Sequence, residues 1–537
     1  MGGEGNTYLD FPTLWNKTHF AWYHTYGLGM MNMSPSGTGL NIILLSLIQI
    51  LTNSTRITNF VLILAIYFFP FLSVYVLAKE MKATLWVSFL IALFYVVNPF
   101  TLYYLTNLNQ GITFSIVAMP LFLWLIIRYY FNNFKLFFSF GLVSTCLSFA
   151  YTNYPLFAIG QFSIIISVFI ANYYWNKKLL FSEVLKKYFL LLVSFVSFNA
   201  WWILSLVNIL PNIGQVYTYD FAKSWLNTVV FNSGDIVGKT FSLTTIIGSD
   251  PSQNFFTYWY NLPFVKFITF VPIFLVLGYI LTRKKIKKED LLILGVLALV
   301  IAVLFFLKGS SMPFGIVYNF LFTHLPLFYI FKTPVDKFGI LYLFLFTILL
   351  LLVFIRLKGQ KTYHFVLMIF SAYLFFCFIP ILTGNIIPDM HNGMAEGFYA
   401  SRKYFDKVDY QHFRQTVNDE KTEYRILSLP GSANYQVCLN NKGKSNYTGL
   451  DPVLMDINKP FIAPYYDNVS VLYDNISMED YKKLLGFYNV KEVLFNKDTC
   501  PWFGYVHEES IDELTGILDQ TMVSRNFGSL TLYDNQY

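Results

Sequence analysis

Long apolar runs recur along the first 384 residues, and they constrain this chain more than any other feature. Each run has about 20 residues, the length that a helix needs to cross a hydrocarbon core about 30 Å thick. Only 13% of the 537 residues are charged, against about 25% in a soluble globular chain. The sequence therefore predicts a mostly α, polytopic transmembrane helical bundle. The expected spans are 57–78, 83–104, 112–131, 135–153, 155–174, 186–207, 264–282, 289–307, 337–355 and 362–384.

Charge is distributed unevenly along the chain. Residues 1–384 carry 24 Lys and Arg against 10 Asp and Glu, whereas residues 385–537 carry 14 against 21. A basic apolar body followed by an acidic, charge-rich tail indicates two domains. The basic excess does not require a nucleic-acid partner, because the cytoplasmic loops of membrane proteins are normally rich in Lys and Arg. We expect the lipid bilayer as a partner and no nucleic acid.

The short loops between the spans alternate between basic and uncharged. The positive-inside rule places the basic loops in the cytoplasm; they are 79–82, 128–135, 177–187, 283–288 and 356–361. The uncharged loops then lie outside, as do three longer segments. We expect a protein of the cell membrane with a first extracytoplasmic loop at 1–56, a bundle at 57–384 and an extracytoplasmic α/β domain at 385–537. The bundle carries a long outer loop at 208–263.

Two apolar segments are not counted as spans. Residues 39–52 are too short to cross comfortably, so we expect a juxtamembrane helix there. Residues 312–331 are interrupted by Pro313 and Pro326, and the alternation of the loops favours a re-entrant or surface hairpin. Because 1–55 is placed outside, we expect one first transmembrane helix upstream of residue 1. A translocated N-terminus is the alternative.

Carboxylates are scarce in the body, so candidates for chemistry can be found by elimination. None sits in the middle of a span, which argues against a carboxylate relay for protons or ions. Six lie outside: Glu4, Asp10, Asp220, Asp235, Asp250 and Asp336. Glu4 and Asp10 follow the expected upstream helix, at the outer membrane surface, where a carboxylate can act as a general base on an acceptor hydroxyl. An ordinary polar loop is the alternative reading.

Lys332 and Lys337 lie on the predicted outer side and break the positive-inside pattern. Lysine binds phosphate as a point charge, so the two side chains are candidates for the phosphate or pyrophosphate of a lipid carrier. Snorkelling to lipid headgroups is the alternative, and Asp336 can pair with either lysine. The histidines lack the spacing of a metal site. No cofactor is indicated, and a divalent metal stays open.

The acidic tail has mixed, soluble patterning. Strands are expected at 424–430, 490–495 and 529–533, and helices at 479–485 and 510–521. They make a small α/β domain without a visible catalytic constellation. Cys438 and Cys500 both fall in this tail, where a disulfide and two free thiols are equally open.

Several short motifs resemble the GT-C membrane glycosyltransferases, most closely the alpha-(1→3)-arabinofuranosyltransferase-like and YfhO-like proteins. The resemblance covers most of the chain. It rests on Gly2-Gly3-Glu4 with Trp22 and Gly27, Asn199-Ala200-Trp201-Trp202, the stretch from Leu325-Pro326 to Lys337-Phe338, Tyr424 to Pro430, and Tyr488-Asn489-Val490-Lys491.

This resemblance implies a polyprenyl-phosphate sugar as donor, an extracytoplasmic glycan or lipid as acceptor, and an acid in the first outer loop. Glu4 stands where the family usually shows Asp after glycine, which keeps Asp10 as a second candidate. The expected function is transfer of a sugar in envelope polysaccharide or glycoconjugate synthesis. Two other classes stay open: a polyprenyl-lipid or polysaccharide transporter, and a non-catalytic factor for envelope assembly.

Overall fold

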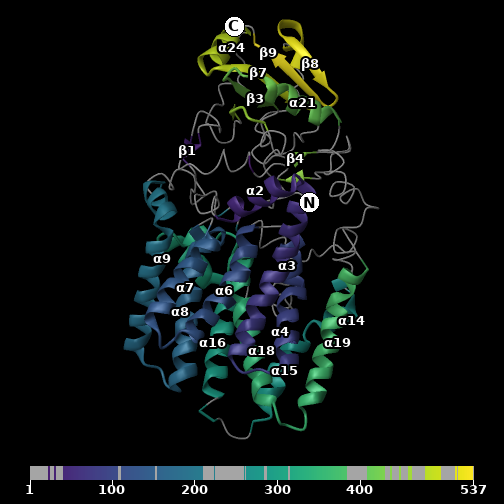
Figure 1. Cartoon of the computed structure of the whole chain (residues 1–537). Helices are drawn as coiled ribbons and strands as arrows, with labels where there is room; N and C mark the ends of the chain where they lie inside the picture. The colour runs from purple at the N-terminus through teal and green to yellow at the C-terminus, as the bar shows by residue number, and fades with distance from the viewer. Residues whose placement is uncertain are drawn as a thin grey trace. The chain divides into compact units, whose positions relative to one another are not determined.

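The structure is a computed structural model of the chain (Figure 1). It describes residues 40–106, 110–151, 154–209, 259–260, 262–283, 287–288, 290–311, 315–383, 408–429, 457–462, 478–497, 515–516 and 518–535, with residues 12, 22–23, 30–31, 223, 226, 436–437 and 447–448. The chain forms two compact units. A helical unit comprises Ser34–Asn41 and Phe60–Pro388, and a second unit comprises Met1–Met33, Ile42–Asn59 and Asp389–Tyr537. The three predicted domains stay a prediction.

Eight helical segments within the described residues are long and apolar enough to cross a membrane. They identify a multi-pass membrane protein and confirm the predicted fold class. These segments are α3 (Thr55–Glu80), α6 (Gln110–Arg128), α8 (Tyr154–Asn176), α9 (Phe181–Ile209), α14 with α15 (Pro263–Ile268 and Val271–Leu281), α16 (Asp290–Leu307), α18 (Pro334–Leu357) and α19 (Tyr363–Leu382).

Three of the ten expected spans are interrupted, and one of them, 264–282, is the pair α14 and α15 described above. Residues 83–104 form α4 (Leu85–Val97) and α5 (Pro99–Thr106), and residues 135–153 form α7 (Asn133–Cys146) and the short η2 (Ser148–Tyr151). The first break lies at Asn98, whose ψ of 154° is extended, because proline disfavours the helical conformation in the preceding residue. Asn98 Nδ2 donates to the carbonyls of Phe94 and Tyr95 at 2.9 and 3.0 Å. These bonds satisfy the last turn of α4.

The two apolar segments that we excluded as spans are short helices. Residues 40–52 form α2 (Leu40–Thr52). Residues 312–331 contain α17 (Gly315–His324) and η4 (Phe328–Phe331). Tyr318 Oη donates to the Phe331 carbonyl at 2.7 Å, so this segment folds back on itself as a hairpin. At ten residues, α17 is too short to cross a membrane.

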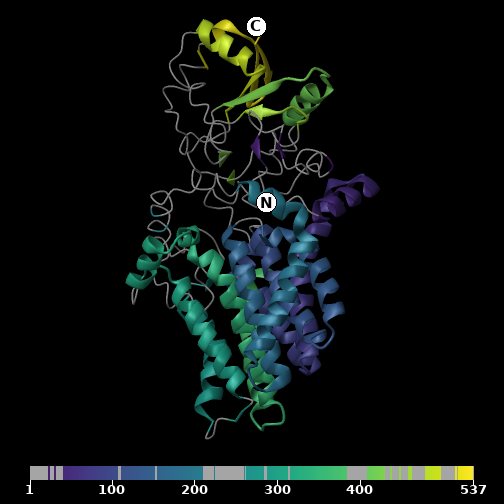
Figure 2. The same ribbon diagram turned by 90° about the vertical axis from the view of Figure 1, so that its left-hand side faces the viewer.

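Helix α18 forms the centre of the helical unit. It is apolar on all sides, and nearly all its side chains from Pro334 to Leu357 are buried, as expected for a helix surrounded by others. It packs against α16, α4, α6, α8 and α15, and Figure 2 shows helices on several sides of it. Helices α3, α9 and α19 instead expose large apolar side chains, among them Phe60, Phe189 and Phe365.

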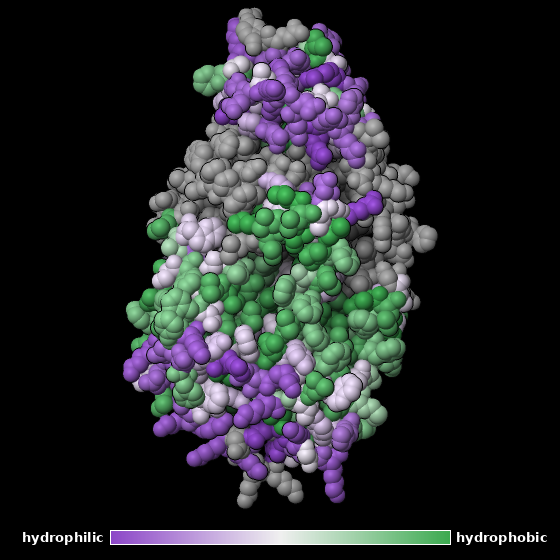
Figure 3. All heavy atoms as spheres, viewed as in Figure 1, coloured by the Kyte–Doolittle hydropathy of each residue, from purple (hydrophilic) through white to green (hydrophobic). Residues whose placement is uncertain are grey.

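The basic loops gather at one end of the helical unit. Arg128, at the end of α6, forms a salt bridge with Glu80 at the end of α3, at 3.1 Å. Tyr173 Oη, near the end of α8, donates to the Lys288 carbonyl at 2.6 Å. Figure 3 shows hydrophilic residues at this end, below a hydrophobic band over the helices. The alternation predicted from the sequence is therefore present, and the side of the membrane that this end faces stays a prediction.

The second unit contains a five-stranded sheet in the order β6-β3-β7-β9-β8. Its strands are β3 (Arg425–Leu429), β6 (Phe461–Ile462), β7 (Val490–Asn496), β8 (Val523–Phe527) and β9 (Leu530–Asp534). The central strand β7 is parallel to β3, with Leu427 opposite Val493, and antiparallel to β9, with Leu494 opposite Leu532. The predicted strands at 424–430, 490–495 and 529–533 are thus present.

Helices cover both faces of this sheet. Helix α24 (Met478–Phe487), predicted at 479–485, brings Tyr481 and Leu485 onto the face of Leu427 and Val493. Helix α21 (Val408–Asp419), which the sequence did not predict, packs against β8 and β9 and places Phe413 against Phe527. Helical residues are described at 515–516 and 518–521, within the predicted helix 510–521.

Candidate functional site

Three lysines occur where α16 ends and α18 begins, at the end of the helical unit away from the basic loops. Lys308 directly follows α16, Lys332 precedes α18 by two residues, and Lys337 lies in the first turn of α18. Lys332 and Lys337 were predicted from the sequence as candidates, whereas Lys308 was not. The signal was available, because Lys308 follows the apolar run 289–307 and lies on the same predicted side by the alternation of the loops.

The turn after α16 is held close to the start of α18. Lys308 Nζ donates to the Ser311 carbonyl at 2.7 Å and lies 5.0 Å from the ring centre of Phe305. Gly309 has a φ of +57°, and a Cβ on it would lie 2.8 Å from Pro334 Cγ. Glycine is therefore required here by both the backbone conformation and the contact with Pro334. The two helix ends approach each other through this contact.

Aromatic rings pack around Phe331, the residue that precedes Lys332. The ring of Phe331 lies 5.4 Å from that of Phe328 and 5.0 Å from that of Phe338. Phe338 in turn stacks on Phe306 of α16, with ring centres 5.3 Å apart. Aromatic pairs at these separations contribute beyond the area that they bury. The backbone that carries Lys332 is thus anchored to both α16 and α18.

Asp336 is held by a residue from a distant part of the chain. Tyr104 Oη, from α5, donates a hydrogen bond to Asp336 Oδ1. Gly339, one turn further along α18, allows this approach, since a Cβ there would overlap the ring of Phe100 in α5. Within the described residues, the partner of Asp336 is therefore Tyr104 rather than either of the lysines that the sequence offered. The bond ties the first turn of α18 to α5.

Lys332 and Lys337 are partly buried and close enough to affect each other electrostatically. Burial, and secondarily the charge of Lys337, lowers the pKa of Lys332 to about 8. A bound anion would relieve the repulsion between the two ammonium groups, and a phosphate oxygen is a suitable acceptor for both. The arrangement can bind a phosphate at the surface of the bundle.

The remaining predicted residues divide into two groups. Glu4 and Asp10, the candidate general bases, lie outside the described residues, as do His19, His24, Cys438 and Cys500. His324 is described, and its ring stacks on Phe320 one turn earlier in α17, with centres 4.5 Å apart. Among the residues that the structure describes, no three His, Cys, Asp or Glu side chains come together as a metal site.

Comparisons with known proteins identify the architecture. No family model and no curated protein matches the chain. The cryo-EM structure of the arabinofuranosyltransferase AftD from Mycobacteria matches over 99% of this chain and 38% of that chain, with a TM-score of 0.60 and 11% identity. The fold is GT-C-like. Two structures of a mutant AftD match with TM-scores of 0.51 and 0.50, at 11% and 12% identity.

This chain spans about 40% of the length of the arabinofuranosyltransferases that it matches. At such identities, the likeness shows the GT-C-like fold alone. The short motifs distributed along the sequence, from Gly2-Gly3-Glu4 to Tyr488-Asn489-Val490-Lys491, suggested the same fold independently of the structural comparison.

Proposed function

We propose that this chain is a membrane glycosyltransferase, or the transferase body of one, that acts in envelope polysaccharide or glycoconjugate synthesis. Its donor is a polyprenyl-phosphate-linked sugar, and its acceptor is an extracytoplasmic glycan or lipid. The protein lies in the cell membrane with residues 385–537 on the extracytoplasmic side. The GT-C-like fold, found over nearly the whole chain, supports this assignment.

The observation that carries the proposal is the lysine pair Lys332 and Lys337 at the start of α18. Both cations lie away from the basic loops, and burial lowers the pKa of Lys332. A cation in such a place is stabilised by an anionic ligand, and the phosphate of a lipid carrier lies at the membrane surface. We therefore assign the donor phosphate to these two residues.

In the proposed reaction, Glu4 or Asp10 takes a proton from an acceptor hydroxyl. The acceptor oxygen then bonds to the anomeric carbon of the sugar, and the bond from that carbon to the phosphate oxygen breaks. The lipid phosphate leaves with one more negative charge than it had in the donor. Lys332 and Lys337 stabilise that charge, which develops in the transition state and is the kind of interaction that accelerates a reaction.

The test is transfer of radiolabelled sugar from polyprenyl-phosphate donors to envelope glycan by the purified protein in lipid nanodiscs. We expect Lys332→Gln and Lys337→Gln each to lower kcat/KM by roughly tenfold or more, the value of a hydrogen bond to a charged group. The double substitution Glu4→Gln with Asp10→Asn is expected to abolish transfer.

Lys358→Gln is the matched control, because it removes an exposed lysine from the basic end and should leave transfer unchanged. Transfer that survives loss of both Glu4 and Asp10 would disprove the catalytic assignment. If no donor supports transfer but the wild-type protein moves the lipid-linked sugar across the bilayer, the chain is a transporter and the proposal is wrong.

A further inference from the structure

A carboxyl group is buried in β7, the central strand of the five-stranded sheet. Glu492 has no exposed surface. Its Oε1 forms an ion pair with Arg525 of β8, a side chain that is more than one-third exposed. The apolar neighbours Leu494 and Leu532 share its face of the sheet. Burial of one ionised partner costs free energy that an exposed partner offsets only in part.

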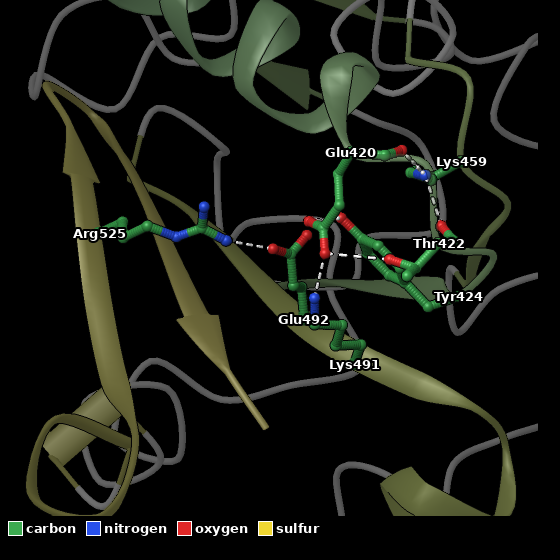
Figure 4. A network of polar contacts seen from close by, with 7 residues as sticks. All are labelled: Glu420, Thr422, Tyr424, Lys459, Lys491, Glu492 and Arg525. Atoms are coloured by element: carbon green, nitrogen blue, oxygen red, sulfur yellow. Dashed lines mark hydrogen bonds and ion pairs between the residues drawn. The ribbon is translucent and has the colours of Figure 1, made fainter. Parts of the chain in front are cut away.

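A second carboxylate, Glu420, lies close to Glu492 (Figure 4). It follows α21 and is held by three donors: Lys491 Nζ, Tyr424 Oη at 2.9 Å and Thr422 Oγ1 at 3.0 Å. The ring of Tyr424 lies between two cations, with the Nζ atoms of Lys459 and Lys491 at 4.8 and 5.0 Å from its centre. Glu420 is therefore fully supplied with donors as a carboxylate.

Glu492 Oε2, unlike the oxygens of Glu420, has no hydrogen-bond donor among the residues that the structure describes. It is buried and accepts no hydrogen bond from them, although the Tyr424 hydroxyl lies close enough to affect the pKa of Glu492. The neighbouring phenol of Tyr424 has a single proton, and that proton goes to Glu420 Oε2. A buried acceptor without a donor is costly. A proton on Oε2 turns this acceptor into a donor, and the lone pairs of Tyr424 Oη can accept from it.

We propose that the folded soluble domain holds a proton on Glu492, which donates to Tyr424 Oη and so completes a chain from Glu492 through Tyr424 to Glu420. Loss of that proton as the pH rises leaves Oε2 unsatisfied and loosens the sheet around β7. The domain thus carries a pH-sensitive element on the side of the protein that is predicted to face the medium. This inference does not rest on the proposed transferase activity.

The charged groups around Glu492 come from each element that packs near it. Strand β8 contributes Arg525, β9 contributes Asp534 opposite Glu492, and β7 itself contributes Lys491. The segment after α21 contributes Glu420 and Tyr424. Helix α21 places His412 against Phe527 and Asp409 beside Gly528, at the turn between β8 and β9. Strand β3 faces Glu492 with the apolar Ile426.

The two carboxyl groups respond to pH in separate ranges. Burial raises the pKa of Glu492 above its ordinary value of 4.5, and the negative charge of Glu420 acts in the same direction. The Tyr424 hydroxyl, Arg525 and Lys491 act in the opposite direction but do not outweigh burial. The bonds from Lys491, Tyr424 and Thr422 lower the pKa of Glu420 below the same value despite its partial burial. The contribution of Glu492 to the stability of the folded state therefore decreases as the pH rises from 4.5 toward its raised pKa. The contribution of Glu420 instead decreases as the pH falls below 4.5.

Hydrogen exchange of the full-length protein in nanodiscs, read by mass spectrometry on peptides from β7 and β9, tests the inference. After correction for intrinsic exchange, the opening constant of the wild-type sheet is expected to rise with pH above 4.5. The slope is up to about tenfold per pH unit and levels off once Glu492 is ionised. Glu492→Gln, which mimics the protonated carboxyl, should remove this slope and remain as protected as the wild type at its acidic optimum.

Two further variants separate proton binding from general damage. Tyr424→Phe removes the acceptor of the proton and should reduce the slope above pH 4.5. Glu420→Gln should instead remove the loss of protection below that pH. A wild-type opening constant that stays flat or falls with rising pH overturns the inference. So does a Glu492→Gln variant that is less protected than the wild type across the whole range.

Discussion

Lys332 and Lys337 form a partly buried lysine pair, and we expect the pKa of Lys332 to depend on the ligand bound there. Burial, and secondarily the charge of Lys337, lowers the pKa of Lys332 to about 8. A phosphate bound between them raises that pKa again, because an opposite charge favours the protonated form. We therefore expect binding of a lipid phosphate at the proposed site to be linked to proton uptake by Lys332.

This linkage predicts a pH dependence of binding. Below pH 8, Lys332 is protonated in the free protein, and above it the charge is lost. We expect the affinity for a short-chain prenyl phosphate to fall as the pH rises from about 7 to about 9, by up to tenfold per unit above the pKa. Titration in nanodiscs measures it. Lys332→Gln should bind more weakly and lose the pH dependence in this range, and an unchanged profile in that variant would show that Lys332 does not bind the phosphate.

The bond from Tyr104 to Asp336 gives a second prediction at this scale. Tyr104→Phe keeps the ring on Phe100, at 4.9 Å, and removes only the hydroxyl. We expect a loss of about 1–2 kcal/mol of stability, read as a lower Tm in detergent, together with weaker binding of prenyl phosphate. Asp336→Asn should give a smaller loss, because the amide oxygen still accepts from Tyr104. Equal Tm values for wild type and Tyr104→Phe would mean that the bond does not position α18.

Some of these residues could be predicted from the sequence and others could not. Lys332 and Lys337 followed from the alternation of basic loops, a local pattern. The hydrogen bond from Tyr104 of α5 to Asp336, which lies between the two lysines in the sequence, joins residues more than 200 positions apart, and no local pattern contains it. Glu492 was assigned to a strand, but its burial was not predicted. Glu492 is fully buried in the folded unit, where the segment after α21 brings Glu420 and Tyr424 close to it.

At the scale of the element, the break between α4 and α5 is fixed by two adjacent residues. Pro99 favours an extended Asn98, and the Asn98 side chain then caps both helices, since Oδ1 accepts from the Thr101 amide at 3.0 Å. Asn98→Ala should leave these groups unsatisfied inside the bundle. We expect a loss of about 1–3 kcal/mol, measured as a lower Tm. Asn98→Asp, which keeps the acceptor for Thr101, should retain part of the stability, and equal losses in both variants would contradict the capping role.

The elements that the sequence missed have weak local signals. Strand β8 reads Val523-Ser524-Arg525-Asn526-Phe527 and exposes most of its side chains, as an edge strand with a polar face does. Strand β6 has only two residues. Strands β3, β7 and β9 were predicted because their buried apolar residues dominate the pattern. The long helices were predicted for the same reason, and the break at Asn98 was missed because the apolar run continues through it.

For the molecule as a whole, the alternation of basic and uncharged loops predicts that the basic end of the bundle faces the cytoplasm. Single cysteines are introduced into a chain whose own four cysteines are replaced, and intact cells are treated with a membrane-impermeant thiol reagent. Leu325→Cys, at an exposed position before η4, should react in intact cells. Lys358→Cys, at the basic end, should react only after the cells are opened. The reverse labelling would show that the basic loops lie outside.

In the proposed mechanism, the end of the bundle around Lys332 and Lys337 binds the phosphate of a lipid carrier. Photo-crosslinking with a diazirine-labelled polyprenyl phosphate in nanodiscs, mapped by mass spectrometry, tests it most directly. We predict adducts on peptides that contain residues 318–345, competed by unlabelled polyprenyl phosphate and strongly reduced in Lys332→Gln with Lys337→Gln. Adducts confined to the basic end, or adducts at 318–345 that are unaffected by both substitutions, would contradict the account.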